Sequence, residues 1–240
     1  MTTFTRAVFF DVDFTLIYPG PTFRGEGYRA FCARYGMDVD AARFPQAVAA
    51  AAPLLDVPDE AYDDEIFIAY TRRIIEGMGG TGAHVDACAR EVYVEWAACH
   101  HFEMYDEVPD VLRALAAAGV RIGLISNSHR CLASFQSHFE LQGLISATVS
   151  SSQHGFMKPH PSIFAAALQL VDAQPADAVM VGDSFRQDVA GALAAGMRAV
   201  LLHRGDTPTP ADADALNVPV IRSLRELAPL LNYPITQLPT

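Results

Sequence analysis

The stretch AVFFDVDFTL, residues 7–16, decides the fold because a wholly apolar run ends in two carboxylates. Ala7 to Phe10 show no polar alternation, which is typical of a strand buried on both faces of a parallel sheet. Asp11 and Asp13 follow at once and can converge on one point where the chain leaves the sheet. Such a pair is costly without a cation, so the stretch predicts a site for a divalent ion such as Mg²⁺.

The same apolar pattern recurs in the second half of the chain, at Arg121–Ser126, Ile145–Ser150, Ala178–Gly182 and Arg198–Leu202. Helical periodicity separates these runs, at Val108–Ala118, Arg130–Phe139, Ser162–Val171 and Gln187–Ala195. Strands that alternate with helices predict an α/β fold with a doubly wound, Rossmann-like parallel sheet. Val218–Ile221 is a candidate further strand, and Ser223 with Glu226 forms a capping-box pattern for a last helix.

The segment between the first and second strands breaks the alternation and shows helical patterns with no convincing buried strand. These patterns cover Arg24–Tyr35, Asp38–Ala52, Asp59–Glu76 and Ala83–His101. We therefore predict two domains, a catalytic core of residues 1–17 and 104–240 and an all-helical cap of residues 18–103. An insertion at this point lies near the carboxyl ends of the strands, where ligands bind in open α/β sheets, so we expect it to act as a lid.

Two patterns in the cap segment have ordinary interpretations. Gly77, Gly79 and Gly82 spell GxGxxG, but they follow a helical pattern rather than a strand, so they predict a turn between helices and not a dinucleotide site. The adjacent His100 and His101 are interpreted as the end of a helix and not as a metal site.

Composition limits the partners. The net charge of −11 and the isoelectric point near 5.0 disfavour nucleic acid, and no apolar stretch reaches the roughly 18 residues that span a bilayer. The first residues do not resemble a signal peptide, so we expect a cytoplasmic protein, monomeric or homodimeric, with a small metabolite as its partner and no membrane contact. The four cysteines show no metal-ligand spacing and are interpreted as reduced thiols.

Polar residues also follow the later strands. The hydroxyl of Ser126 and backbone N–H groups near Asn127 can donate hydrogen bonds to phosphate oxygens, although Ser and Asn are also common helix caps. Lys158, before Pro159, is the only lysine of the chain, which suggests a need for a compact point charge beside an aspartate and a phosphate. A solvated loop lysine is the alternative.

The last polar group is GDSFRQD, residues 182–188. Asp183 follows an apolar strand, and Asp188 comes about one helical turn later. One of these acids can complete a metal site while the other orients a ligand, a water or Lys158. Helix capping is the alternative for Asp183.

The four motifs, DxDxT, Ser-Asn after a strand, Lys-Pro and GDxxxxD, resemble in order and spacing those of the haloacid dehalogenase superfamily, whose helical cap the insertion also resembles. The resemblance implies a Mg²⁺-dependent phosphohydrolase of a small phosphorylated metabolite, in which Asp11 is the nucleophile that becomes phosphorylated. Asp13 would protonate the leaving group and then activate water. The remaining implied roles are phosphate binding by Ser126, Asn127 and Lys158, Mg²⁺ binding by Asp11, the Asp13 carbonyl and Asp183, and support of the site by Asp188 and Thr15.

Several alternatives stay open within this resemblance. A phosphomutase would use the same nucleophile and acid. True 2-haloacid dehalogenases lack a carboxylate at the position of Asp13, and phosphonate hydrolysis would need a cap lysine, which the segment lacks. A non-catalytic binding module is the last alternative. Phe14 stands where the family usually has glycine, which leaves the substrate open.

Overall fold

The computed structural model describes residues 5–55, 61–205, 213 and 215–231. The chain divides into two compact units, unit 1 of residues 1–18 and 104–240 and unit 2 of residues 19–103. None of the described helices is long and apolar enough to cross a membrane.

Unit 1 is built on a six-stranded parallel sheet in the order β5-β4-β1-β6-β7-β8. Its strands are β1 (Ala7–Phe10), β4 (Arg121–Ser126), β5 (Ile145–Ser150), β6 (Ala178–Gly182), β7 (Arg198–Leu202) and β8 (Val220–Ile221). The predicted parallel sheet is confirmed. Phe10 pairs with Leu124 on one side and with Val181 on the other, so β1, β4 and β6 end at one edge.

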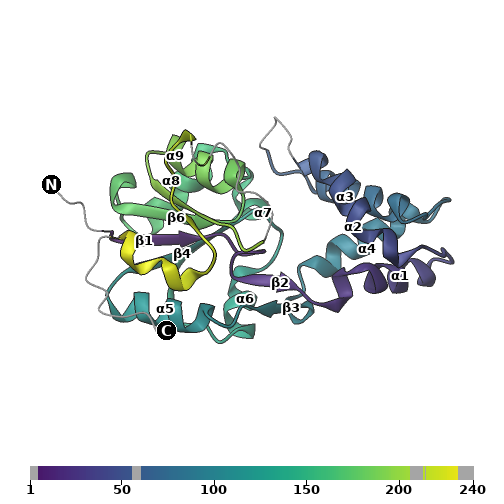
Figure 1. Cartoon of the computed structure of the whole chain (residues 1–240), viewed down its shortest axis with the longest axis horizontal. Helices are drawn as coiled ribbons and strands as arrows, with labels where there is room; N and C mark the ends of the chain where they lie inside the picture. The colour runs from purple at the N-terminus through teal and green to yellow at the C-terminus, as the bar shows by residue number, and fades with distance from the viewer. Residues whose placement is uncertain (1–4, 56–60, 206–212, 214, 232–240) are drawn as a thin grey trace. The chain divides into compact units, whose positions relative to one another are not determined.

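Helices cover both faces of this sheet (Figure 1), with α8 (Pro161–Leu170) and α9 (Gly191–Ala194) on one side and α5 (Val108–Ala117) on the other. β1 is buried along its whole length, as the apolar run predicts. Packing is close across the sheet, since a Cβ atom at Gly123 would lie 2.4 Å from the ring of Phe9. The absence of a side chain at Gly123 in β4 therefore leaves room for the ring of Phe9 on the neighbouring strand β1.

Other elements of unit 1 differ in detail from the sequence expectations. The pattern over 187–195 forms a π-helical turn, η6 (Phe185–Ala190), before α9, and α6 begins two residues late, at Leu132–His138. The capping box of Ser223 and Glu226 is present, but it starts the short 3-10 turn η7 (Leu224–Glu226) rather than an α-helix. The remaining short elements are α7 (Ser151–His154), η5 (Pro175–Asp177) and η8 (Ala228–Leu231).

The described part of unit 2 contains four α-helices, namely α1 (Gly25–Arg34), α2 (Phe44–Ala51), α3 (Asp64–Gly77) and α4 (Val85–Trp96). Short 3-10 turns lie between and around them, namely η1 (Pro21–Phe23), η2 (Ala41–Arg43), η3 (Ala52–Leu55) and η4 (Cys99–His101). α2 starts later than predicted because Pro45 takes one of its first two positions. Asp59, the predicted start of α3, lies outside the described residues.

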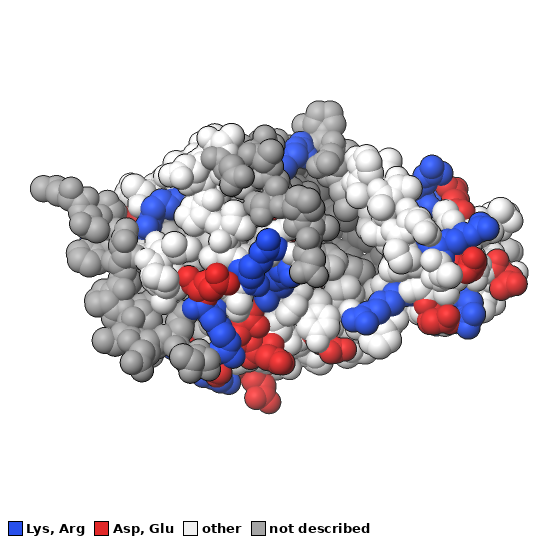
Figure 2. Space-filling model, viewed as in Figure 1, with Lys and Arg blue, Asp and Glu red and all other residues white. Residues whose placement is uncertain are grey.

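The glycine-rich stretch 77–82 is the turn between α3 and α4, as predicted. Gly79 and Gly82 have φ angles of 106° and 97°, in the region that favours glycine. On the face of unit 2 in Figure 2, basic and acidic side chains are interspersed rather than gathered by sign. Arg29 pairs with Glu26, for example, at 2.6 Å.

The prediction of an all-helical segment between the first and second strands of the sheet was wrong at its two ends. β2 (Ile17–Pro19) and β3 (Phe102–Met104) form a separate two-stranded sheet. Each has three residues and only one of them is buried, so neither gives the apolar run that marks the core strands.

Candidate active site

Lys158 and Asp11 form the centre of a buried charge cluster at the carboxyl edge of the sheet. The Lys158 ammonium donates to Asp11 Oδ1 at 2.6 Å, to Asp188 Oδ1 at 2.6 Å and to the Ile125 carbonyl at 2.8 Å. Lys158 and Asp188 are almost fully buried, and Asp11 is 8% exposed. A lysine that uses all three of its protons in this way is held in one place. The interpretation of Lys158 as a solvated loop residue is therefore wrong.

The backbone of Lys158 is held by the side-chain amide of Asn127. Asn127 Oδ1 accepts from the Lys158 N–H at 2.7 Å, and Asn127 Nδ2 donates to the Lys158 carbonyl at 2.9 Å and to Gln187 at 3.2 Å. Asn127 was predicted to bind phosphate. Its side chain instead positions the lysine, and a direct contact with phosphate stays a prediction.

Asp183 and Asp188 bring two more carboxylates to the same place. The side chains of Asp11, Asp183 and Asp188 each offer an oxygen within 4.8 Å of the other two. Asp188 also accepts from the Ser184 N–H at 3.0 Å. A Cβ atom at Gly182 would lie 2.2 Å from the Asp188 carboxyl group, so only glycine allows Asp188 to fold back over the end of β6.

Burial and crowding shift the pKa values of this cluster. Desolvation raises the pKa of Asp11 to about 7, with Lys158 opposing the shift and Asp188 adding to it. Asp183 keeps an exposed side, yet loss of surrounding water and the charges of its two neighbours raise its pKa well above the ordinary value. Burial lowers the pKa of Lys158, but the charges of Asp11 and Asp188 outweigh it and raise that pKa above its usual range.

The phosphate-binding hydroxyl predicted at Ser126 lies buried at the end of β4. Its Oγ is 2.9 Å from Ser128 Oγ, and Ser128 Oγ accepts from the N–H of Arg130 at 3.4 Å. Lys158 also contacts the end of β4, because its ammonium donates to the carbonyl of Ile125, the residue before Ser126.

Asp13 has a partner that the sequence reasoning missed. Arg130, whose side chain is completely buried, donates to Asp13 Oδ1 at 2.9 Å. Phe14, the next residue after Asp13, has a φ angle of 64°, which explains why glycine is usual at this position. Phe14 is 45% exposed.

A second missed arginine holds the loop that follows β1. Arg204 donates to the Thr15 carbonyl at 3.1 Å and to the buried Glu107 at 2.6 Å, and its guanidinium lies 3.6 Å from the ring centre of Tyr105. Thr15 itself is buried, and its hydroxyl has no hydrogen-bond partner among the described residues. Arg204 therefore anchors the backbone of Thr15, and support of the site by the Thr15 side chain stays a prediction.

Comparison with known proteins agrees with this geometry. The family model described as haloacid dehalogenase-like hydrolase matches residues 5–196. The chain belongs to this family. The matched residues include every motif from Asp11 to Asp188, so the resemblance to the haloacid dehalogenase superfamily is confirmed.

Individual relatives are more distant. A haloacid dehalogenase-like hydrolase domain-containing protein 3 from Bos taurus is 28% identical over 60% of this chain and 58% of its own length. The match thus spans less than two thirds of that relative. A ribulose-1,5-bisphosphate 5-phosphatase from Halopiger xanaduensis is 32% identical over 81% of this chain and 83% of its own. A HAD-hydrolase from Bacillus subtilis has the same fold, with a TM-score of 0.73 at 17% identity over 95% of this chain and 99% of that one.

Proposed function

We propose that this chain hydrolyses small phosphate monoesters, with Asp11 as the nucleophile and Mg²⁺ as the cofactor. The observation that carries the proposal is the buried Lys158 ammonium, which donates to Asp11 and to Asp188 at 2.6 Å each, with Asp183 grouped with these two carboxylates. A named phosphatase relative that matches over most of both chains adds support.

The residues fit a magnesium ion. Three carboxylates with oxygens within 4.8 Å of one another form an all-oxygen donor set, which is what Mg²⁺ prefers. Burial, with a contribution from the charge of Asp188, raises the pKa of Asp11 although Lys158 opposes the shift, so a bound cation would favour the ionised carboxylate. Asp188 is bound to Lys158 and to the Ser184 N–H, so Asp11 and Asp183 are the side chains we assign to the metal, with the Asp13 carbonyl. A bound Mg²⁺ would supply Lewis-acid stabilisation of the phosphoryl charge.

The chain's own groups account for both steps. Asp11 attacks phosphorus, the bond to the leaving-group oxygen breaks, and Asp13 gives that oxygen a proton. Asp13 then takes a proton from a water, which attacks the aspartyl phosphate and releases inorganic phosphate and the free carboxylate of Asp11. Lys158 neutralises charge on the phosphoryl group, together with donors near Ser126.

Arg130 acts through Asp13 in this scheme and is a positioning residue. Because its guanidinium is buried, it fixes one oxygen of the Asp13 carboxylate at 2.9 Å and limits the rotamers of that side chain. A proton donor must lie within hydrogen-bond reach of the leaving oxygen, so this restraint decides how often Asp13 is in place.

The test is release of phosphate from para-nitrophenyl phosphate and from a panel of sugar and nucleotide monophosphates, with Mg²⁺ and with excess EDTA. Release that requires Mg²⁺ supports the proposal and ranks substrates. Halide release from 2-haloacids, with no phosphate release, would instead indicate a dehalogenase. Exchange between sugar-phosphate isomers without net hydrolysis would indicate a phosphomutase.

A further inference from the structure

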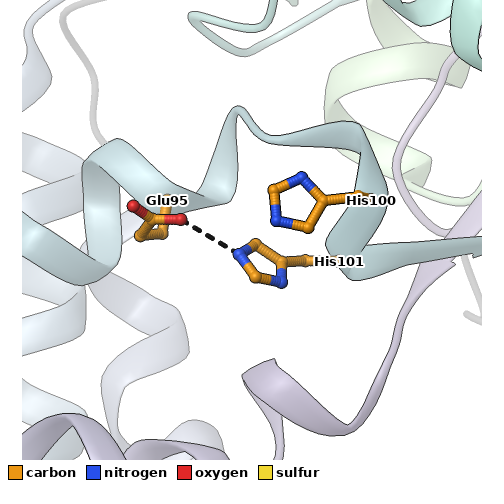
Figure 3. A group of neighbouring side chains, drawn as sticks. All are labelled: Glu95, His100 and His101. Carbon is orange, nitrogen blue, oxygen red and sulfur yellow. Dashed lines mark hydrogen bonds and ion pairs between the residues drawn. The ribbon is translucent and has the colours of Figure 1, made fainter.

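A group of metal-ligating side chains lies in unit 2, outside the motifs of the proposed active site. Glu95 is the residue before the last of α4, and His100 and His101 lie on the 3-10 turn η4 that follows. Figure 3 shows the three side chains converging from the two elements. Each offers one ligand atom within 4.8 Å of the other two.

The separation of two of these atoms suits a shared ion. His101 Nε2 lies 3.0 Å from Glu95 Oε2. Zinc binds imidazole nitrogen and carboxylate oxygen at about 2.0–2.2 Å, so two ligands about 3 Å apart can hold one ion between them. The hydrogen bond that joins them without metal thus preorganises the pair.

Helix-end packing explains only part of the group. His101 is largely buried and packs edge-on against Phe23 at 5.4 Å between ring centres, and its bond to Glu95 ties η4 to α4. His100 is exposed, and its ring lies 4.0 Å from that of His101. An exposed imidazole tilted at 46° to the ring of His101 adds little stability, but it completes a ligand set.

We propose that Glu95, His100 and His101 form a site for a transition-metal ion of the zinc class. Two imidazole nitrogens and one carboxylate suit Zn²⁺, whereas Mg²⁺ and Ca²⁺ take oxygen ligands. Three protein ligands leave a fourth position for water. The site is distinct from the all-oxygen cluster in unit 1 in both its residues and its metal preference.

The test is calorimetric titration of the tag-free chain with Zn²⁺. Excess Mg²⁺ is present to occupy the carboxylate cluster of unit 1, so that the titration reports Zn²⁺ binding elsewhere. Trp96, the only tryptophan, follows Glu95 and has its ring 4.6 Å from Phe23, so its fluorescence gives an independent local signal. We expect one equivalent of bound Zn²⁺. His100→Ala should weaken its binding at least about tenfold.

Two variants separate metal ligation from packing. Glu95→Gln keeps the size of the side chain and its hydrogen-bonding ability but is a poor ligand, so it should weaken Zn²⁺ binding and leave thermal unfolding without metal unchanged. His138→Ala, on an exposed position at the end of α6, should bind Zn²⁺ as the parent chain does. No Zn²⁺ binding by the parent chain, or equal binding by parent and His100→Ala, would overturn the proposal.

Discussion

The charge cluster of the proposed active site in unit 1 differs from an ion pair of unit 2 in its burial. In unit 1 the ammonium of Lys158 is buried between Asp11 and Asp188, and the pKa of Asp11 is raised to about 7. In unit 2 Arg90 pairs with Glu65 at 2.6 Å, an equally short distance, but both side chains are about half exposed. Water and salt screen the second pair and not the first. Burial of charge, rather than pairing distance, therefore distinguishes the proposed active site from the ion pairs of unit 2.

Among substitutions in the buried cluster of unit 1, Asp11→Asn should have the largest effect on turnover. Turnover should fall by at least about 10⁴-fold, because the amide cannot form the covalent intermediate, while the fold is kept. Phosphate release and circular dichroism measure the two effects. Retention of more than a few per cent of the activity would exclude Asp11 as the nucleophile.

Lys158→Ala should come next. Loss of the ammonium leaves Asp11 and Asp188 buried and unpaired, which should cost about 3–5 kcal/mol of unfolding free energy. Transition-state stabilisation should fall by about 2 kcal/mol or more, roughly 30-fold in kcat/KM. Urea unfolding and steady-state kinetics are the measurements. Lys158→Arg is the control, since a planar guanidinium keeps the charge but does not match three convergent contacts, and it should remain impaired.

Arg130→Met tests the restraint on Asp13. If Arg130 positions the proton donor, the loss in kcat/KM should be about tenfold larger for alkyl phosphates than for para-nitrophenyl phosphate, whose leaving group departs without a proton. Equal losses on both substrates would assign Arg130 to stability alone.

Without metal, stability should depend on pH in a direction set by the raised pKa of Asp11. A carboxyl with a folded pKa of about 7 and an unfolded value of 3.8 binds protons more tightly in the native state, so its stabilisation is lost as pH rises through 7. The melting temperature in EDTA should therefore fall between pH 5 and about 8, and Mg²⁺ should restore it. Asp11→Asn should flatten this dependence, and an unchanged slope would contradict the assignment.

The smallest effect on stability is expected for the exposed ion pairs of unit 2. Arg90→Ala removes contacts to Glu65 and Asp86, yet the melting temperature should change by no more than about 2 °C and the activity not at all. A larger shift would show that this exposed ion pair contributes more to stability than its exposure implies.

Much of the fold could be predicted from the sequence because burial on both faces gives the core strands continuous apolar runs, as in β1 and β6. The short strands β2 and β3 lack this signal. The π-helical turn at 185–190 also has no pattern of its own. This turn contains Asp188, whose carboxyl group packs against Gly182. Helical periodicity cannot predict such a tertiary contact.

The site shows the same limit. Asp11, Lys158, Asp183 and Asp188 could be predicted to meet because each follows a strand or a motif at the same sheet edge. Arg130 could not, because an arginine near a helix start usually lies in solvent, and its partner Asp13 is 117 residues away in the chain. The role of Asn127 as a brace for Lys158 depends likewise on a contact that spans 31 residues.

The central position of β1 has a consequence for how the protein is made. This strand pairs only with β4 and β6, whose residues are synthesised more than a hundred positions later. At about 5–20 residues per second, a ribosome needs roughly 10–30 s to reach β6 after β1. During that interval the apolar strand β1 and the proposed nucleophile that follows it are both without sheet partners. Protection of this segment by chaperones during synthesis should therefore affect the yield of folded protein.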